Sequence, residues 1–267
     1  MKALQFMSPN TMAVNEIAIP KIADDEVLLA SRSVGICHSD IELLEGRYII
    51  PFQYPIIPGH EWAAEVMEVG SKVSKLKAGD RVVGECVIGQ EHFGFSISGA
   101  MAEFFIAKAD WLHKLPENVS WTQGALVEPF SCGYYATVRA DNMDASDTVA
   151  VFGAGPIGLG VIAASAAKGA RVIVIEPSAD RAKVALSLGA DVVIDPTKQN
   201  TKDAVMDATH GVGATIVMDA SGRPDAMAAT LEVASFHGRV VIIGISVGGK
   251  APAEMGLIQS KELQVRG

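Results

Sequence analysis

Four side chains that could bind a metal ion occur in three short segments of the N-terminal half of the chain. Cys37 lies in the segment Gly-Ile-Cys-His-Ser-Asp, His60 and Glu61 are adjacent, and Glu128 stands in the segment Val-Glu-Pro. Thiolate, imidazole and carboxylate are all donor types that catalytic zinc accepts. Taken singly, each residue also has an ordinary structural interpretation, since a lone cysteine is usually a small buried hydrophobe. The four residues are therefore candidate metal ligands.

A second chemical signature is a glycine-rich loop, Gly-Ala-Gly-Pro-Ile-Gly, between a short apolar run and an Ala-rich segment typical of a helix. In such a turn Gly153 makes the turn tight, Gly155 lets backbone N–H groups approach a pyrophosphate, and Gly158 lets the helix pack close to the strand. Pro156 and Ile157 belong to the same loop, at the positive end of the helix dipole. The loop therefore predicts a dinucleotide-binding site.

Further residues refine the expected cofactor. Glu176 follows the glycine loop by about twenty residues at the end of the next apolar run, where it can accept hydrogen bonds from an adenosine ribose. Its charge would repel a 2′-phosphate, which favours NAD over NADP, although Arg181 could partly offset the repulsion. Ser221, in the segment Asp-Ala-Ser-Gly at the end of a later strand, is expected to lie along the cofactor.

The hydrophobic pattern divides the chain into two parts. Up to about residue 114, short apolar runs are broken by Gly and Pro, as in all-β structure. From Thr148 onward, strands alternate with helices, which is typical of a parallel sheet. A helix over residues 119–139 is expected to bridge the parts, and we place the domains at residues 1–145 and 146–267. The expected strands are residues 27–31, 63–69, 81–83 and 102–107 in the first part, and residues 148–152, 172–175, 192–194, 215–218, 240–243 and 262–265 in the second.

Composition restricts the class of protein. The chain has 267 residues, 49% of them hydrophobic, and a formal net charge of −9, so it can bury a large core and lacks the basic surface that nucleic acid or an anionic membrane requires. No apolar run is long enough to span a bilayer. Three widely spaced cysteines argue against a disulfide framework. We expect a cytoplasmic protein that acts on a small molecule.

These motifs, in this order, resemble those of the medium-chain, zinc-dependent alcohol dehydrogenases, and within them the sorbitol and butanediol (polyol) dehydrogenase-like branch. The resemblance covers essentially the whole chain and implies an α/β fold, with a GroES-like β-rich catalytic domain followed by a doubly wound Rossmann sheet that binds NAD. It implies one catalytic zinc ion, with Cys37 and His60 as ligands. Glu61 and Glu128 are then the two carboxylates of the site, one bound to the metal and the other holding its water. The sequence leaves open which is which.

The implied reaction is hydride transfer between a secondary alcohol or polyol and NAD. Zinc lowers the pKa of bound water from 15.7 to about 7, and an alcohol in that position is expected to lose its proton likewise. Ser39 matches the proton-relay hydroxyl of the family. The relay histidine of the family is replaced by Glu42, which is equally well interpreted as a solvated surface charge.

Two further departures from the family pattern are visible. Many relatives carry a lobe with four closely spaced cysteines that bind a structural zinc ion, whereas this region contains Cys86 alone. We therefore expect no structural zinc. The segment that ends at Gly267 resembles the sixth strand of the nucleotide-binding sheet, after which relatives continue and return to the catalytic domain. We therefore expect the catalytic domain to lack this return, leaving apolar surface exposed.

Two alternatives to a zinc polyol dehydrogenase stay open. One is a zinc-free quinone-reductase-like relative, against which the complete set of candidate ligands argues. The other is an inactive nucleotide-binding fragment of a dehydrogenase. The identity of the substrate is not determined, and Ser39, Tyr48, Phe52 and Glu103 are candidates for lining its pocket. By the resemblance, a homodimer or homotetramer is possible.

Overall fold

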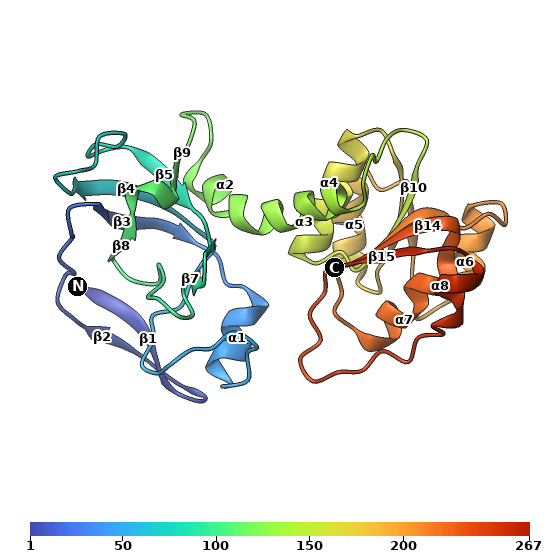
Figure 1. The fold of residues 1–267 in the computed structure, drawn as a ribbon, viewed down its shortest axis with the longest axis horizontal. Helices are drawn as coiled ribbons and strands as arrows, with labels where there is room; N and C mark the ends of the chain where they lie inside the picture. Colours follow the sequence, from blue (N-terminus) through green and yellow to red (C-terminus); the bar gives the residue numbers. More distant parts are fainter. The chain divides into compact units, whose positions relative to one another are not determined.

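The computed structural model describes residues 1–267, which divide into two compact units, Met1–Glu128 and Pro129–Gly267. Figure 1 shows the first unit in blue to green and the second in green, from helix α3 onward, to red. The division falls just inside helix α3 (Val127–Arg139), whereas the change in sequence pattern lies nearer residue 145. The domain limits 1–145 and 146–267 remain a prediction.

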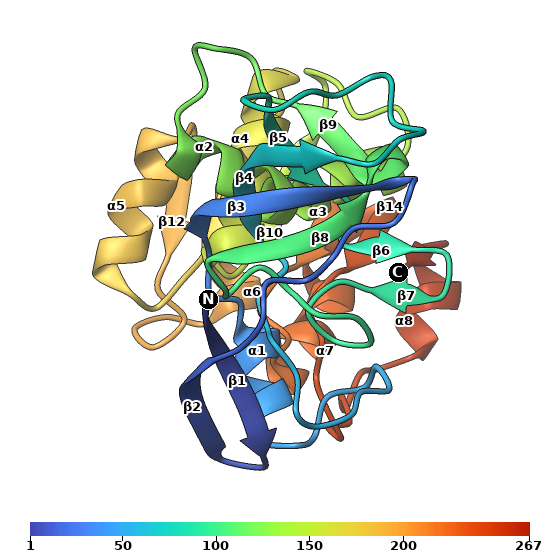
Figure 2. The same cartoon turned by 90° about the vertical axis from the view of Figure 1, so that its left-hand side faces the viewer.

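The first unit is built on a five-stranded antiparallel sheet with the strand order β8-β3-β4-β5-β9. A hairpin of β1 and β2 lies beside it, close to the N-terminus in Figure 2. A second, two-residue hairpin is formed by β6 and β7. The strands are β1 (Lys2–Ser8), β2 (Thr11–Glu16), β3 (Glu26–Val34), β4 (Trp62–Val69), β5 (Arg81–Gly84), β6 (Val87–Ile88), β7 (Glu91–His92), β8 (Phe104–Lys108) and β9 (Leu112–Lys114).

The core of this unit is centred on aromatic side chains. Trp62, Phe93 and Phe105 are almost fully buried and meet one another with ring centroids 4.8–5.6 Å apart. Alternate residues of β3, including Val27 and Leu29, pack on the same core because successive side chains of a strand point to opposite faces. The sheet therefore provides a rigid base for the loops at its ends.

The first unit also contains three short helices. They are α1 (His38–Leu44), between β3 and β4, the 3-10 helix η1 (Ala109–Trp111), between β8 and β9, and α2 (Trp121–Ala125), which directly precedes α3. The expected single helix over residues 119–139 was wrong in one respect. The segment forms α2 and α3, with Leu126 between them. Ser120 begins α2 through a capping box with Gln123.

The second unit is a six-stranded parallel sheet with the order β12-β11-β10-β13-β14-β15. From β10, the strands β11 and β12 are added on one side of the sheet, and the strands β13, β14 and β15 on the other. The carboxyl end of β10 therefore lies at the topological switch point, where open parallel sheets bind ligands. The strands are β10 (Thr148–Phe152), β11 (Arg171–Ile175), β12 (Val192–Ile194), β13 (Ala214–Asp219), β14 (Ala234–Ile242) and β15 (Gln264–Arg266). The helices are α4 (Pro156–Ala167), α5 (Ala179–Ser187), α6 (Thr201–Ala208), α7 (Pro224–Val233) and α8 (Gly256–Ser260).

Helices cover both faces of this sheet, and each face has its own core. One core contains Val149, Val151 and Val161, and the other contains Ala150, Phe152 and Leu231. Consecutive residues of β10 thus serve opposite cores, which explains why the strand is an unbroken apolar run. The expected α/β class and doubly wound sheet are confirmed. No helix of the chain is long and apolar enough to cross a membrane.

Candidate metal centre and cofactor loop

The loop between β3 and α1 positions Cys37 and Ser39. Cys37 is the residue that precedes the first turn of α1, and its extended backbone directs the chain out of the sheet. Its N–H donates a 2.9 Å hydrogen bond to Oδ2 of Asp40, which fixes the start of the helix. Cys37 is half-buried, so its sulfur is held at a rigid helix end and remains within reach of a ligand.

His60 and Glu61 lie immediately before β4, and Glu61 is held against the Cys37 loop. The N–H of Gly35 donates to the carbonyl oxygen of Glu61 at 2.6 Å. A side chain at residue 35 would collide with this carboxylate, because a Cβ there would lie 2.2 Å from Oε2 of Glu61. One ligand atom from each of Cys37, His60 and Glu61 can be chosen so that all three lie within 4.8 Å of one another.

Asp40 and Ser39 contact the two edges of the His60 imidazole. Oδ1 of Asp40 lies 3.7 Å from Nδ1, and both atoms are buried without a hydrogen-bond partner. Oγ of Ser39 lies 3.5 Å from Nε2. The ring packs on Phe95, which stacks in turn on Tyr48. His60 is thus enclosed on several sides and has little freedom to rotate.

Burial makes charge unfavourable throughout this cluster. It raises the pKa of the Cys37 thiol, with a smaller contribution from the nearby carboxylates, while hydrogen bonding to Ser39 opposes the rise. Burial likewise raises the pKa values of Asp40 and Glu61 and lowers the pKa of His60. For Asp40 and His60, the charge of each residue partly opposes the shift that burial causes in the pKa of the other. Acidic groups crowded together in this way are stabilised in their charged forms by a divalent cation.

Glu128, in the first turn of α3, lies near this cluster but outside the group of three possible ligands. Burial raises its pKa to about 7, and the negative charge of Glu61 adds to the rise. The side chain of Cys86 forms a hydrogen bond with Glu128, which opposes it. The first unit therefore places a second, easily protonated carboxyl close to the candidate ligands.

The residues fit a zinc ion. A thiol, an imidazole and a carboxylate converge, which matches the three protein ligands of a catalytic site. Asp40 stands behind His60, where an outer carboxylate usually orients a metal-binding imidazole by accepting the proton of its other nitrogen. The unpartnered Nδ1 of His60 and Oδ1 of Asp40 are the atoms that such an arrangement would pair.

Two residues near the candidate ligands, Asp40 and Cys86, were not identified as site residues from the sequence. Asp40 was noted only as part of the cysteine motif, although its position three residues after Cys37 is typical of a residue that caps a helix. Cys86 was considered only as the single cysteine in the region where relatives bind a structural zinc ion. It directly precedes the β6–β7 hairpin, and only the fold brings it to Glu128.

The alternative interpretation of Glu42 as a solvated surface charge was wrong. Glu42 is 8% exposed, and its Oε1 lies 3.2 Å from Nη1 of Arg47 and 3.7 Å from Nε2 of His38. The physical reason is that α1 turns this position inward and the returning chain supplies Arg47 as a counter-charge.

The candidate pocket residues differ in their surroundings. Tyr48 and Phe52 pack against an apolar cluster centred on Leu43 and Phe95. Burial, followed by the nearby Cys37, raises the pKa of Tyr48 to about 12, and hydrogen bonding to the side chain of Ser39 opposes the rise. Glu103 is exposed, and Oε2 accepts the N–H of Lys2 at 2.8 Å. Tyr48 therefore places its hydroxyl near the cluster, whereas Glu103 braces strand β1.

In the second unit, the glycine loop connects β10 to α4. Gly153 has a φ of 92° and lies against Ser221, and a Cβ at Gly158 would be 2.0 Å from the carbonyl oxygen of Gly153. A Cβ at Gly155 would meet nothing within 4 Å, so the space in front of that residue is open. Pro156 is the first residue of α4 and Ile157 the second. The glycines thus close the turn and leave a helix N-terminus free to accept an anion.

Glu176 is tied to this loop. The residue is 4% exposed, and its Oε2 and Oε1 accept hydrogen bonds from the N–H groups of Ala154 and Ser178, each at 2.8 Å. Each oxygen retains lone-pair capacity for one further donor. Arg181 is exposed on the first turn of α5, and Ser221 donates to Asp219 at 2.6 Å.

Comparison with known proteins places this geometry in a family. The model of the "Alcohol dehydrogenase GroES-like domain" matches residues 23–117, and the model "Zinc-binding dehydrogenase" matches residues 156–267. D-arabitol-phosphate dehydrogenase of Enterococcus avium is 32% identical, over 100% of this chain and 82% of that protein.

Two solved structures are similar over the whole chain. That of 2R,3R-butanediol dehydrogenase from Bacillus subtilis has a TM-score of 0.91 and 32% identity, and 83% of it is covered. That of a zinc-binding dehydrogenase from Sinorhizobium meliloti 1021, bound to NADP, has a TM-score of 0.94 and 26% identity, and 83% of it is covered.

A metal-ligand cluster on a β-rich unit, followed by a parallel sheet with a dinucleotide loop, defines a metal-dependent dehydrogenase. The chain belongs to the zinc-binding alcohol dehydrogenase family, in its polyol and butanediol dehydrogenase branch. It is an oxidoreductase of the class that transfers hydride between an alcohol and a nicotinamide cofactor.

Proposed function

We propose that this enzyme oxidises a secondary hydroxyl of a polyol or diol with NAD, using one zinc ion held by Cys37, His60 and Glu61. The observation that carries the proposal is the convergence of one possible ligand atom from each of these three residues within 4.8 Å. Glu128 is then the outer carboxylate, because it lies near Glu61 but outside the group of three. A zinc ion there would act as a Lewis acid that lowers the pKa of the substrate hydroxyl.

The residues around the ligands supply the remaining steps. Oγ of Ser39 lies beside the His60 imidazole, so it accepts the proton released by the substrate and passes it outward. Asp40 orients the imidazole from its other edge. In the second unit, the open space in front of Gly155 admits the pyrophosphate, and the α4 N-terminus binds it.

The preference for NAD rests on Glu176. Its buried carboxylate lies against the glycine loop, where a 2′-phosphate would introduce like charge, while a ribose hydroxyl would donate to it. The NADP-bound relative shows that the family also uses the other cofactor, so both must be compared. By resemblance to the family, we also propose a homodimer or homotetramer as the solution state, measurable by sedimentation.

The test is a steady-state assay of NADH and NADPH formation with free polyols, vicinal diols and polyol phosphates, together with metal analysis of the purified protein. We expect bound zinc, turnover of secondary alcohols, and a higher kcat/KM with NAD. Cys37→Ser should lose zinc and activity, whereas Cys132→Ser, at an exposed cysteine, should retain both. Retention of zinc and turnover in Cys37→Ser would refute the ligand assignment.

A further inference from the structure

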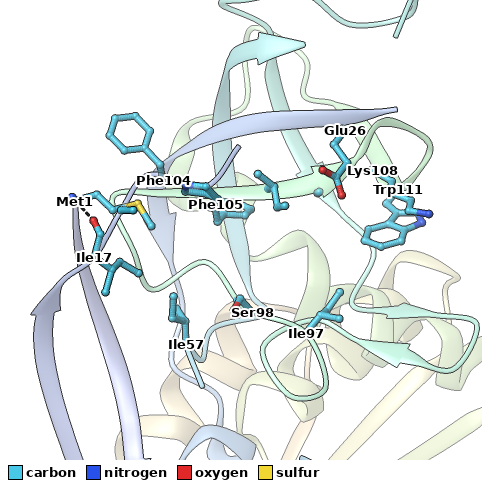
Figure 3. A pocket seen from close by; sticks show the side chains of 15 residues that line it. Met1, Ile17, Glu26, Ile57, Ile97, Ser98, Phe104, Phe105, Lys108 and Trp111 are labelled. Atoms are coloured by element: carbon cyan, nitrogen blue, oxygen red, sulfur yellow. Dashed lines mark hydrogen bonds between the residues drawn. The ribbon is translucent and has the colours of Figure 1, made fainter. Parts of the chain in front are cut away.

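An apolar cavity in the first unit offers no specific binding chemistry. It has a volume of about 410 Å³ and lies between strand β8 and the loop that carries Ile97, as Figure 3 shows. Glu26, on its wall, accepts the N–H of Ala23 at 2.8 Å. Nζ of Lys108, also on its wall, lies 3.7 Å from Oδ2 of Asp25. Both charged side chains of the lining therefore already have partners, and the cavity indicates no particular ligand.

Asp219, in the second unit, is a fully buried carboxylate without a role in the proposed reaction. It is the last residue of β13, the strand next to β10, and its exposed fraction is 0%. Burial raises the pKa of Asp219, whereas hydrogen bonds from Ser221 and Gly222 oppose the rise. A buried carboxylate must be stabilised by donors that the surrounding chain supplies. The donors that approach Asp219 therefore indicate what it holds in place.

The side chain of Asp219 organises the turn that follows β13. Oδ1 accepts the hydroxyl of Ser221 at 2.6 Å and the N–H of the same residue at 3.2 Å. Oδ2 accepts the N–H of Gly222 at 3.2 Å. This turn lies against the glycine loop, since a Cβ at Gly153 would be 3.2 Å from Cβ of Ser221. Both oxygens of the carboxylate are thus used to shape a turn beside the dinucleotide loop.

The backbone of Asp219 holds a second turn, which follows β14. Its carbonyl oxygen accepts the N–H groups of Ile243 and Gly244, each at 2.9 Å. The two turns are closely packed, because a Cβ at Gly244 would lie 2.1 Å from the nitrogen of Gly222 and 2.5 Å from Oδ2 of Asp219. A Cβ at Gly222 would lie 2.5 Å from the carbonyl oxygen of Ile245. One residue therefore joins the chain segments at the carboxyl ends of two neighbouring strands.

The place of these turns in the sheet indicates which half of the cofactor they serve. A dinucleotide lies across the carboxyl ends of the strands, with its pyrophosphate at the N-terminus of the helix that follows β10. Glu176, the proposed partner of the adenosine ribose, directly follows β11, on one side of β10. β13 and β14 lie on the other side of β10. The nicotinamide half is therefore expected at the turns that Asp219 joins.

We propose that Asp219 is a positioning residue for the nicotinamide half of the cofactor, because it fixes the turns after β13 and β14 in the form that binds this half. The inference rests on the proposed use of a nicotinamide dinucleotide. Asp219→Asn replaces one carboxylate oxygen by an amino group, so the N–H of either Ser221 or Gly222 loses its acceptor. If the turns then adopt the binding form about one-tenth of the time, the affinity for NAD falls about tenfold.

The test measures the binding of NAD and of ADP to the purified full chain by calorimetry. ADP keeps the adenosine and two phosphates but lacks the nicotinamide riboside, so a loss confined to NAD separates positioning from general damage to the sheet. We expect Asp219→Asn to weaken NAD about tenfold and to bind ADP as the native chain does. Equal losses for both ligands would overturn the proposal.

Asp147→Asn is the matched control. Asp147 is a buried aspartate of the same unit that precedes β10 at the opposite end of the sheet, where Oδ1 accepts the hydroxyl of Thr215 at 2.8 Å. This variant should leave the ratio of the NAD and ADP affinities unchanged, whatever its melting temperature. A loss confined to NAD in Asp147→Asn as well would assign the effect to destabilisation of the unit and overturn the proposal.

Amide hydrogen exchange provides a second measurement, and Ser221→Ala a second variant if Asp219→Asn does not fold. Ser221→Ala removes the 2.6 Å hydrogen bond to Oδ1, so the amides of Gly222 and Gly244 should exchange faster in it and NAD should bind more weakly than in the native chain. Unchanged exchange of both amides would overturn the proposal. Failure of the native chain to bind NAD would refute the proposed function and this inference together, whereas unchanged NAD affinity in a folded Asp219→Asn would refute this inference alone.

Discussion

Replacing Asp40 by asparagine tests how the ligand cluster is held together. Asp40 contacts two of the proposed ligands, since Oδ2 accepts the N–H of Cys37 at 2.9 Å and Oδ1 lies 3.7 Å from Nδ1 of His60. Asparagine keeps a carbonyl oxygen for the Cys37 N–H and removes only the negative charge. The variant therefore separates orientation of the imidazole from capping of helix α1.

The size of the effect follows from the distance. Two unit charges about 4 Å apart interact by about 4 kcal/mol at an effective dielectric constant of 20. A zinc-bound imidazole gains only part of a positive charge, so we expect Asp40→Asn to weaken zinc binding by about 1.5 to 3 kcal/mol. This corresponds to roughly 10- to 100-fold in affinity, the usual effect of losing an outer partner of a metal ligand.

Zinc affinity would be measured by competition with a chromogenic chelator, and folding by circular dichroism of the zinc-free protein. Asp110→Asn is the matched control, because this carboxylate is in the same unit, is 88% exposed and contacts only Lys75, at 3.9 Å. It should leave zinc affinity unchanged. An Asp40→Asn variant that folds and binds zinc as tightly as Asp110→Asn would refute the orienting role.

Three further predictions concern single groups. The pKa of Glu128 is raised from its ordinary value of 4.5 to about 7, so the zinc-free protein should lose roughly 3 kcal/mol of stability as the pH rises from 4.5 to 7. Thermal unfolding should show no such loss in Glu128→Gln. Gly158→Ala should lower the melting temperature because its Cβ meets Gly153, whereas Gly155→Ala should preserve it and weaken NAD in calorimetry. Glu176→Ala should weaken NAD more than NADP in the same assay, and equal losses would contradict a ribose contact.

The sequence determined the features that depend on neighbouring residues. Alternation of strand and helix from Thr148 onward predicted the parallel sheet, because a strand buried on both faces must be continuously apolar. The glycine loop was predictable for a similar reason, since the tight turn at Gly153 and the close packing at Gly158 require the absence of a side chain. Cys37 and the His60–Glu61 pair were recognisable as donors of suitable type.

Only the tertiary structure decided which of these groups meet. The grouping of Cys37 with His60 and Glu61 depends on how the β3–α1 loop packs against the start of β4. The pattern of neighbouring residues in the sequence does not predict that packing. The burial of Glu42 and the contact of Cys86 with Glu128 have the same origin. Burial and charge pairing are set by residues distant in sequence, whereas helix, strand and turn preferences are set within a few residues.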